Sequence, residues 1–121
     1  MNMTKTVLVV DDQVGIRLLL EEVITQESYH VELAVNGKEA YEKIVDKQPD
    51  LIMLDYRLPI IDGPRLIEML AEKNYQIPIV MMSGLPDKAR EGVKNIDMVC
   101  EIVEKPFQLN DIREMVSNIL K

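Results

Sequence analysis

Residues 51–63 read LIMLDYRLPIIDG, a short apolar run that ends in one acidic residue, Asp55. The run LIML is apolar throughout, which is typical of a strand covered on both faces in a parallel sheet. The pair Asp62-Gly63 indicates a turn before the next element. Asp55 is therefore expected at the carboxyl end of a buried strand, the edge at which open α/β sheets bind their ligands.

Similar apolar runs alternate with helical patterns along the whole chain. Further strands are predicted at residues 6–10, 78–82 and 99–103, with a weaker one at 31–34. Helical spacing of apolar residues occupies residues 16–24, 40–45, 66–70 and 109–120, and a poorer helix is predicted at 86–93. Five strand-helix units favour a parallel sheet with helices on both faces. We predict an α/β, flavodoxin-like, doubly wound (βα)5 fold with five strands in the order 2-1-3-4-5.

Length and composition limit the classes of function. The 121 residues suit one domain and are too few for an additional output domain. A net charge of −7 argues against nucleic-acid binding, and it reflects either a solvated surface or acids gathered around a cation. No apolar run approaches about 18 residues and no signal peptide begins the chain, so a cytoplasmic protein without a membrane span is expected. The single cysteine, Cys100, is predicted to be a buried, inert thiol.

Chemically active residues stand at the ends of four predicted strands. Asp11 and Asp12 follow the first strand, Asp55 the third, Ser83 the fourth and Lys105 the fifth. Each has a structural explanation, since Asp caps helices, Ser forms turns and Lys covers surfaces. Those strands are consecutive neighbours in the predicted order, so the coincidence favours one crevice that gathers all five side chains.

These residue types fit phosphoryl transfer. Three close carboxylates repel one another, and a hard cation such as Mg²⁺ relieves the repulsion. A carboxylate is a competent nucleophile for an aspartyl-phosphate, and Asp55 on the central strand is the natural choice. Ser83, Lys105 and the metal would stabilise the transferred group. The only histidine, His30, is expected in a surface turn, so a donor histidine must belong to another protein.

Four motifs together resemble the receiver-domain family of two-component signalling, the CheY-like response regulators. They are VLVVDDQ at 7–13, LIMLDYRLPIIDG at 51–63, MMSG at 81–84 and VEKPF at 103–107. The resemblance implies phosphorylation of Asp55 and Mg²⁺ binding by Asp12, Asp55 and the Arg57 backbone carbonyl, with Asp11 acting mostly through water. Mn²⁺ or Ca²⁺ would substitute in crystals. It also implies that Ser83 and Lys105 contact the phosphoryl group, and that the Lys105-Pro106 peptide bond is cis.

Residues 11–23, DDQVGIRLLLEEV, resemble a narrower group of stand-alone phosphorelay receivers that control sporulation initiation. This implies a monomer that takes a phosphoryl group from a sensor histidine kinase and passes it to a histidine phosphotransferase. An aspartyl-phosphate phosphatase is a further implied partner, and the chain would not be a classical turnover enzyme. The implied docking surface consists of Gln13, Gly15, Ile16, Leu19, Pro106 and Phe107. The alternative for Ile16 and Leu19 is an ordinary place in the core.

The chain departs from the family pattern at two places, and two alternative functions are kept in view. Ile102 stands where many receivers have an aromatic residue whose rotation accompanies switching, and Met98-Val99 replace a frequent Gly-Ala. A chemotaxis-type receiver, in which phosphorylation changes affinity for a target, is one alternative function. A flavodoxin-like flavin carrier is another, although an acidic crevice disfavours the anionic cofactor.

Overall fold

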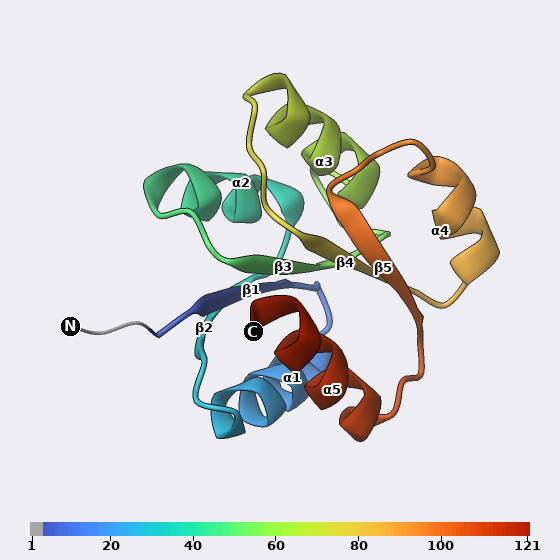
Figure 1. Cartoon of the computed structure of the whole chain (residues 1–121). Helices are drawn as coiled ribbons and strands as arrows, with labels where there is room; N and C mark the ends of the chain where they lie inside the picture. The colour runs from blue at the N-terminus through green and yellow to red at the C-terminus, as the bar shows by residue number, and fades with distance from the viewer. Residues whose placement is uncertain (1–3) are drawn as a thin grey trace.

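The computed structural model describes residues 4–121, which form a five-stranded parallel sheet in the order β2-β1-β3-β4-β5 (Figure 1). The strands are β1 Thr6–Val10, β2 His30–Ala34, β3 Leu51–Asp55, β4 Ile79–Ser83 and β5 Val99–Glu104. The helices are α1 Val14–Gln26, α2 Gly37–Asp46, α3 Gly63–Glu72, α4 Pro86–Gly92 and α5 Leu109–Leu120. The predicted fold class, strand number and strand order are confirmed.

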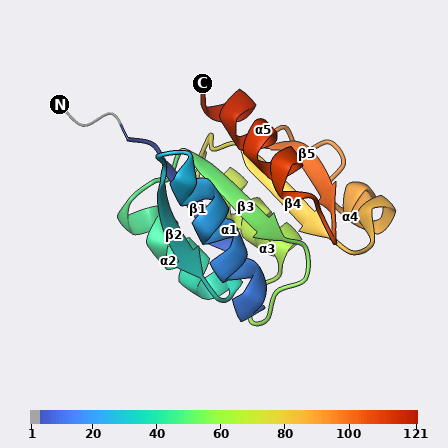
Figure 2. The same cartoon turned by 90° about the horizontal axis from the view of Figure 1, so that it is seen from below.

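Side chains of the central strands alternate between two apolar clusters, one on each face of the sheet. On β1, Val7 and Val9 pack with residues of α1 and α5, whereas Leu8 and Val10 pack with residues of α2, α3 and α4. Figures 1 and 2 show the same division, with α1 and α5 together on one face. Strands buried on both faces have to be apolar at every position, which explains the continuous runs in the sequence.

Strands β2, β3 and β5 are one residue longer than predicted and β4 is shifted by one residue, which changes the surroundings of three residues. Asp55 and Ser83 are the last residues of β3 and β4, so ladder pairing fixes their backbone. His30 is the first residue of β2 rather than part of a turn, although it is exposed as expected. Cys100 is exposed, so the prediction of a buried thiol was wrong. It lies on edge strand β5, where the register shifts opposite Ile79 and Val80.

Two helices on one face begin with side-chain caps that hold the preceding loops. The Asn36 side chain accepts a hydrogen bond from the Glu39 N–H at 2.8 Å, and the Glu39 carboxylate accepts one from the Val35 N–H at 3.2 Å. Asp62 accepts from the Arg65 N–H at 2.9 Å at the start of α3. The loops before α2 and α3 are thus anchored at the carboxyl edge of the sheet. None of the helices in residues 4–121 is long and apolar enough to cross a membrane.

Candidate functional site

Three carboxylates meet at the carboxyl edge of β1 and β3. Asp11 and Asp12 follow β1, Asp55 ends β3, and the potential ligand oxygens of the three lie within 4.8 Å of one another. Asp11 and Asp55 are buried, whereas Asp12 is exposed. The buried pair therefore forms the floor of the site and Asp12 its solvent-facing side.

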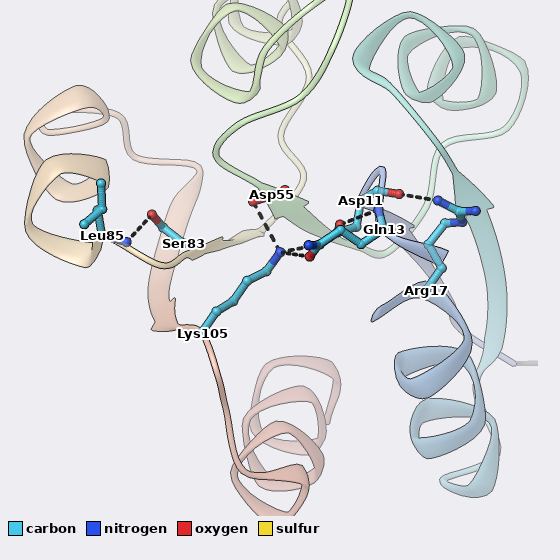
Figure 3. A network of polar contacts seen from close by, with 7 residues as sticks. All are labelled: Asp11, Gln13, Arg17, Asp55, Ser83, Leu85 and Lys105. Carbon is cyan, nitrogen blue, oxygen red and sulfur yellow. Dashed lines mark hydrogen bonds and ion pairs between the residues drawn. The ribbon is translucent and has the colours of Figure 1, made fainter. Parts of the chain in front are cut away.

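The Lys105 ammonium, from the segment after β5, lies between the carboxylates of Asp11 and Asp55 (Figure 3). Its Nζ is 2.6 Å from Asp11 Oδ2 and 3.5 Å from Asp55 Oδ1, and it donates to Gln13 Oε1 at 3.4 Å. The backbone N–H of Lys105 donates to the Ser83 carbonyl at 2.8 Å, which fixes this segment to the end of β4. The Lys105-Pro106 peptide bond is cis, as expected. One cation thus connects the acids of two strands.

Asp11 is held from several directions by groups of Gln13, helix α1 and strand β2. Its Oδ1 accepts a hydrogen bond from the Gln13 N–H at 2.9 Å, and its carbonyl accepts one from Arg17 Nη1 at 2.8 Å (Figure 3). The Asp11 N–H donates to the Ala34 carbonyl at 3.2 Å. The contribution of Arg17 escaped the sequence analysis, because its partner is a backbone carbonyl and no side-chain pattern signals that contact.

The environment of Asp55 works against its ionisation. Burial, and then the Asp11 charge, raise the pKa of this carboxyl from 3.8 to about 6, while Lys105 and a backbone hydrogen bond with Arg57 act in the opposite direction. A carboxyl that is costly to ionise gains most from an added cation. This favours metal binding beside Asp55.

The residues of the cluster fit a hard divalent cation. Within the described residues, Asp11, Asp12 and Asp55 are the one group of three potential ligands, and all three offer carboxylate oxygen with no imidazole or thiolate among them. Such a donor set suits Mg²⁺, Mn²⁺ or Ca²⁺ better than zinc. The role expected for the Arg57 carbonyl stays a prediction, because the contact that the structure shows is the backbone hydrogen bond with Asp55.

Ser83 lies at the same edge, but its hydroxyl is directed toward the start of α4 (Figure 3). Ser83 is buried, and its Oγ accepts a hydrogen bond from the Leu85 N–H at 2.9 Å. The structure therefore places Ser83 on the neighbouring strand end and engages its oxygen with the loop. A contact between this hydroxyl and a phosphoryl group on Asp55 stays a prediction.

The expected docking residues divide into exposed and packed ones. Gln13, Gly15, Leu19 and Pro106 are exposed, whereas Ile16 and Phe107 are half-buried against the cluster under α1 and α5. The sequence analysis missed Val14 and Leu18, which are more exposed than Leu19 at 61% and 56% against 37%. Their spacing of four residues places them on one face of α1, and this spacing is the sequence signal for an exposed apolar face there.

Comparisons with known proteins agree with this arrangement. The response regulator receiver domain model matches residues 7–117. Sporulation initiation phosphotransferase F of Bacillus subtilis is 33% identical over 120 residues, which are 98% of this chain and 95% of the relative.

Solved structures give the same result. The receiver domain of a Francisella response regulator has a TM-score of 0.87 at 26% identity, with 96% of each chain covered. Response regulator TrrA of Thermotoga maritima, solved in complex with Mg²⁺-BeF, has a TM-score of 0.84 at 30% identity, covering 97% of this chain and 100% of that one. With the family model matching nearly the whole chain and the predicted sheet order observed, this protein belongs to the response regulator receiver domain family.

Proposed function

We propose that this protein is a stand-alone phosphorelay response regulator. Asp55 accepts a phosphoryl group from a phosphohistidine of a sensor histidine kinase in a Mg²⁺-dependent reaction, and a histidine phosphotransferase then receives it. The observation that carries the proposal is the position of the Lys105 ammonium, 3.5 Å from Asp55 Oδ1 within a site of three carboxylates. A nucleophile, a metal-binding donor set and a cation for the transferred group occupy one crevice.

The residues divide the chemistry among them. An Asp55 oxygen forms the new O–P bond as the N–P bond of the donor phosphohistidine breaks, and the electron pair of that bond returns to the imidazole. Asp11, Asp12 and Asp55 would hold Mg²⁺, which supplies positive charge to the phosphoryl oxygens when it is bound. Lys105 neutralises Asp11 in the resting protein and lies close enough to Asp55 to pair with a phosphoryl oxygen. Onward transfer to a second histidine reverses these steps.

Two observations support the narrower assignment to a sporulation phosphorelay: the similarity to sporulation initiation phosphotransferase F and the residue at position 102. Sporulation initiation phosphotransferase F is covered over 95% of its length, which supports a single receiver domain, and its name supports a role in sporulation. Ile102 is half-buried on β5 and packs against the apolar cluster under α4. The chain therefore has no aromatic ring at this position whose rotation could accompany phosphorylation of Asp55. A relay protein hands on its phosphoryl group and needs no such switch, which favours relay over a chemotaxis-type binding module.

The docking surface for both histidine proteins would consist of Gln13, Gly15, Ile16, Leu19, Pro106 and Phe107. The geometry supports this surface because Gln13 touches Lys105 and therefore joins the surface to the site. The exposed Val14 and Leu18 extend it along α1. Histidine-bearing helical proteins present apolar helix faces that fit such a surface. An aspartyl-phosphate phosphatase would approach the same edge.

A phosphotransfer assay tests the function directly. Each sensor kinase and histidine phosphotransferase of the same cell, labelled on its histidine, is mixed with the wild-type protein and with the D55N and D46N variants. We expect Mg²⁺-dependent, base-labile labelling of the wild type and of D46N, which alters an exposed carboxylate of α2. The D55N variant should stay unlabelled. Labelling of D55N would refute the site, and labelled protein that passes nothing to any phosphotransferase would favour the binding module.

Calorimetric titration with Mg²⁺ tests the metal half of the proposal. Replacing Asp12 by Ala removes a hard ligand and should weaken Mg²⁺ binding about tenfold or more. Replacing Lys105 by Met should leave Mg²⁺ binding equal or tighter, because the ammonium competes for Asp11 and ligates no metal. Equal losses in the two variants would contradict these roles.

A further inference from the structure

Exposed apolar side chains concentrate around the carboxyl edge of the sheet. Among residues 4–121, seven large apolar residues are exposed: Val14, Leu18, Leu19, Val35, Val45, Ile60 and Leu85. Val14, Val35, Ile60 and Leu85 lie in the segments that directly follow β1, β2, β3 and β4. Ile60 is the most exposed of the seven, at 72%, and belongs to the loop between Asp55 and α3. This loop runs at the same end of the molecule as the start of α1 (Figure 2).

Ile60 also has an unfavourable backbone conformation. Its φ is 70°, in the left-handed region that β-branched residues rarely adopt. The Ile61 N–H donates to the Pro59 carbonyl at 2.8 Å, so residues 59–61 form a tight three-residue turn of the strained kind. The other described non-glycine residues with positive φ are Ser28, Asn74 and Asn95, which are short and polar. The protein therefore exposes the branched apolar side chain of Ile60 although its backbone conformation is unfavourable.

The surrounding loop is firmly anchored. A β-carbon on Gly37 would lie 1.9 Å from the Ile61 carbonyl oxygen, so the loop backbone is pressed against the start of α2. A β-carbon on Gly63 would lie 2.8 Å from the Asp55 carbonyl oxygen, so the far end of the loop returns to the phosphoacceptor. Leu58 is buried in the apolar cluster on the α2 and α3 side. These contacts fix the strained turn and present Ile60 from a rigid base.

The geometry of transfer determines what covers this side chain. Asp55 is only 8% exposed, so a phosphohistidine reaches it only if the surface of the donor closes over the rim of the crevice. α1 and α5 border one side of that rim, and the Ile60 loop borders the opposite side through its contact with α2. A donor that is centred on Asp55 therefore touches both sides.

We propose that Ile60 is a specificity-determining anchor for the protein that donates the phosphoryl group, contacting an apolar residue beside the donor histidine. The proposal rests on the proposed function. A second copy of this chain is a poorer occupant, because each copy carries a net charge of −7 and like charges oppose self-association. Ile60 thereby adds a contact on the α2 side of Asp55, away from the docking surface on α1 and the Lys105 segment.

A comparison of two phosphodonors distinguishes an effect of Ile60 on docking from an effect on the chemistry of Asp55. The protein donor is the labelled kinase or phosphotransferase that phosphorylates the wild type fastest, and the small donor is acetyl phosphate with Mg²⁺. The variants are I60G and I60N, which suit positive φ but lack the apolar side chain, I60L, which keeps an apolar side chain, and V45A, an exposed control on α2. We expect I60G and I60N to lose about tenfold in rate with the protein donor, whereas I60L and V45A stay close to the wild type.

With acetyl phosphate all four variants should react at the wild-type rate, and I60G and I60N should unfold at a higher temperature than the wild type because strain is relieved. An unchanged rate of I60G with the protein donor would overturn the anchor. Equal losses with both donors would assign Ile60 to the chemistry of Asp55 instead of docking. A wild-type dimer that becomes a monomer in I60G would make a second copy the occupant and also overturn it. Failure of the wild type with every donor would instead refute the proposed function.

Discussion

In the proposed function Asp55 meets two opposing demands, since a nucleophile has to be ionised while a buried carboxyl resists ionisation. Burial and the Asp11 charge outweigh Lys105 and raise the pKa of Asp55 to about 6. The folded protein without metal therefore binds the Asp55 proton more tightly than the unfolded chain does. At neutral pH the ionised carboxylate lowers the free energy of unfolding, and a bound cation would offset that loss.

This residue predicts a specific pH dependence of stability. Unfolded Asp titrates near 3.8, so stability from this group is fully present below that pH and is lost as pH rises toward about 6. In EDTA at pH 7, the D55N variant should exceed the wild type in free energy of unfolding by roughly 1–3 kcal/mol. The difference should shrink below pH 4 and on addition of Mg²⁺. Urea denaturation at pH 3.5 and 7 measures it, with D46N as the control.

A D55N variant that is less stable than the wild type at pH 7 would show that the Lys105 contact outweighs burial. The position of Lys105 makes this comparison informative, because its Nζ is closer to Asp11 than to Asp55. Asp11 therefore keeps its partner when Asp55 is neutralised.

The residue types at the strand ends predicted which side chains would lie at one edge of the sheet, but not which hydrogen bonds they would form there. Asp11, Asp12, Asp55 and Lys105 gather as expected, because strand order and parallel direction place them at one edge. The hydrogen bond that the Leu85 N–H donates to Ser83 Oγ depends on a side-chain torsion that sequence does not specify. The Arg17 contact depends on a backbone carbonyl, whose position follows only from the folded turn.

At the scale of elements, apolar periodicity located every helix and strand, and the errors are concentrated at edges. Strand ends shifted by a residue because ladder pairing extends beyond the apolar run into Asp55 and Ser83. Cys100 was misplaced because its apolar run was taken as covered on both faces, although it lies on an edge strand where the register shifts opposite Ile79 and Val80. The strained turn at Ile60 carries no local signature, since contacts with Gly37 and Gly63 impose it.

Two glycines at the starts of helices should respond in opposite directions to the same substitution. A β-carbon on Gly15 would have nothing within 4 Å, so G15A should raise the free energy of unfolding by a few tenths to about 1 kcal/mol through helix propensity. A β-carbon on Gly37 would meet the Ile61 carbonyl, so G37A should lower it by about 1–3 kcal/mol or more. Urea denaturation measures both variants.

The G37A variant should also disturb the loop that carries Ile60, because the clash falls on the backbone of Ile61. Relative to acetyl phosphate, its phosphorylation by a protein donor should fall more than that of V45A, the exposed control on α2. A stable G37A would mean that the loop shifts freely, in contradiction to a rigid base for Ile60.

At the scale of the whole molecule, the site is attached to the most buried strands and bordered by a weaker periphery. β3 and β4 are buried along their whole length, and β1 is buried from its second residue. By contrast, α4 has seven residues, one buried side chain and no side-chain cap, and edge strand β5 is half-exposed. The well-buried strands β1 and β3 therefore carry Asp11, Asp12 and Asp55, whereas the side of the molecule formed by α4 and β5 is the part that can open locally.

Hydrogen exchange with and without Mg²⁺ distinguishes these two halves. Amides of β1 and β3 should exchange only through global unfolding, so Mg²⁺ should slow them by the same factor by which it stabilises the fold, about 100-fold at 100 times its dissociation constant. Amides of α4 should exchange faster in EDTA and barely respond to Mg²⁺, because local opening there leaves Asp11, Asp12 and Asp55 in place. Mass spectrometry of peptides from 6–10, 51–55 and 86–92 measures the contrast. If α4 slowed as much as β1, the helix would open only when the whole sheet unfolds, and a locally mobile α4 would be excluded.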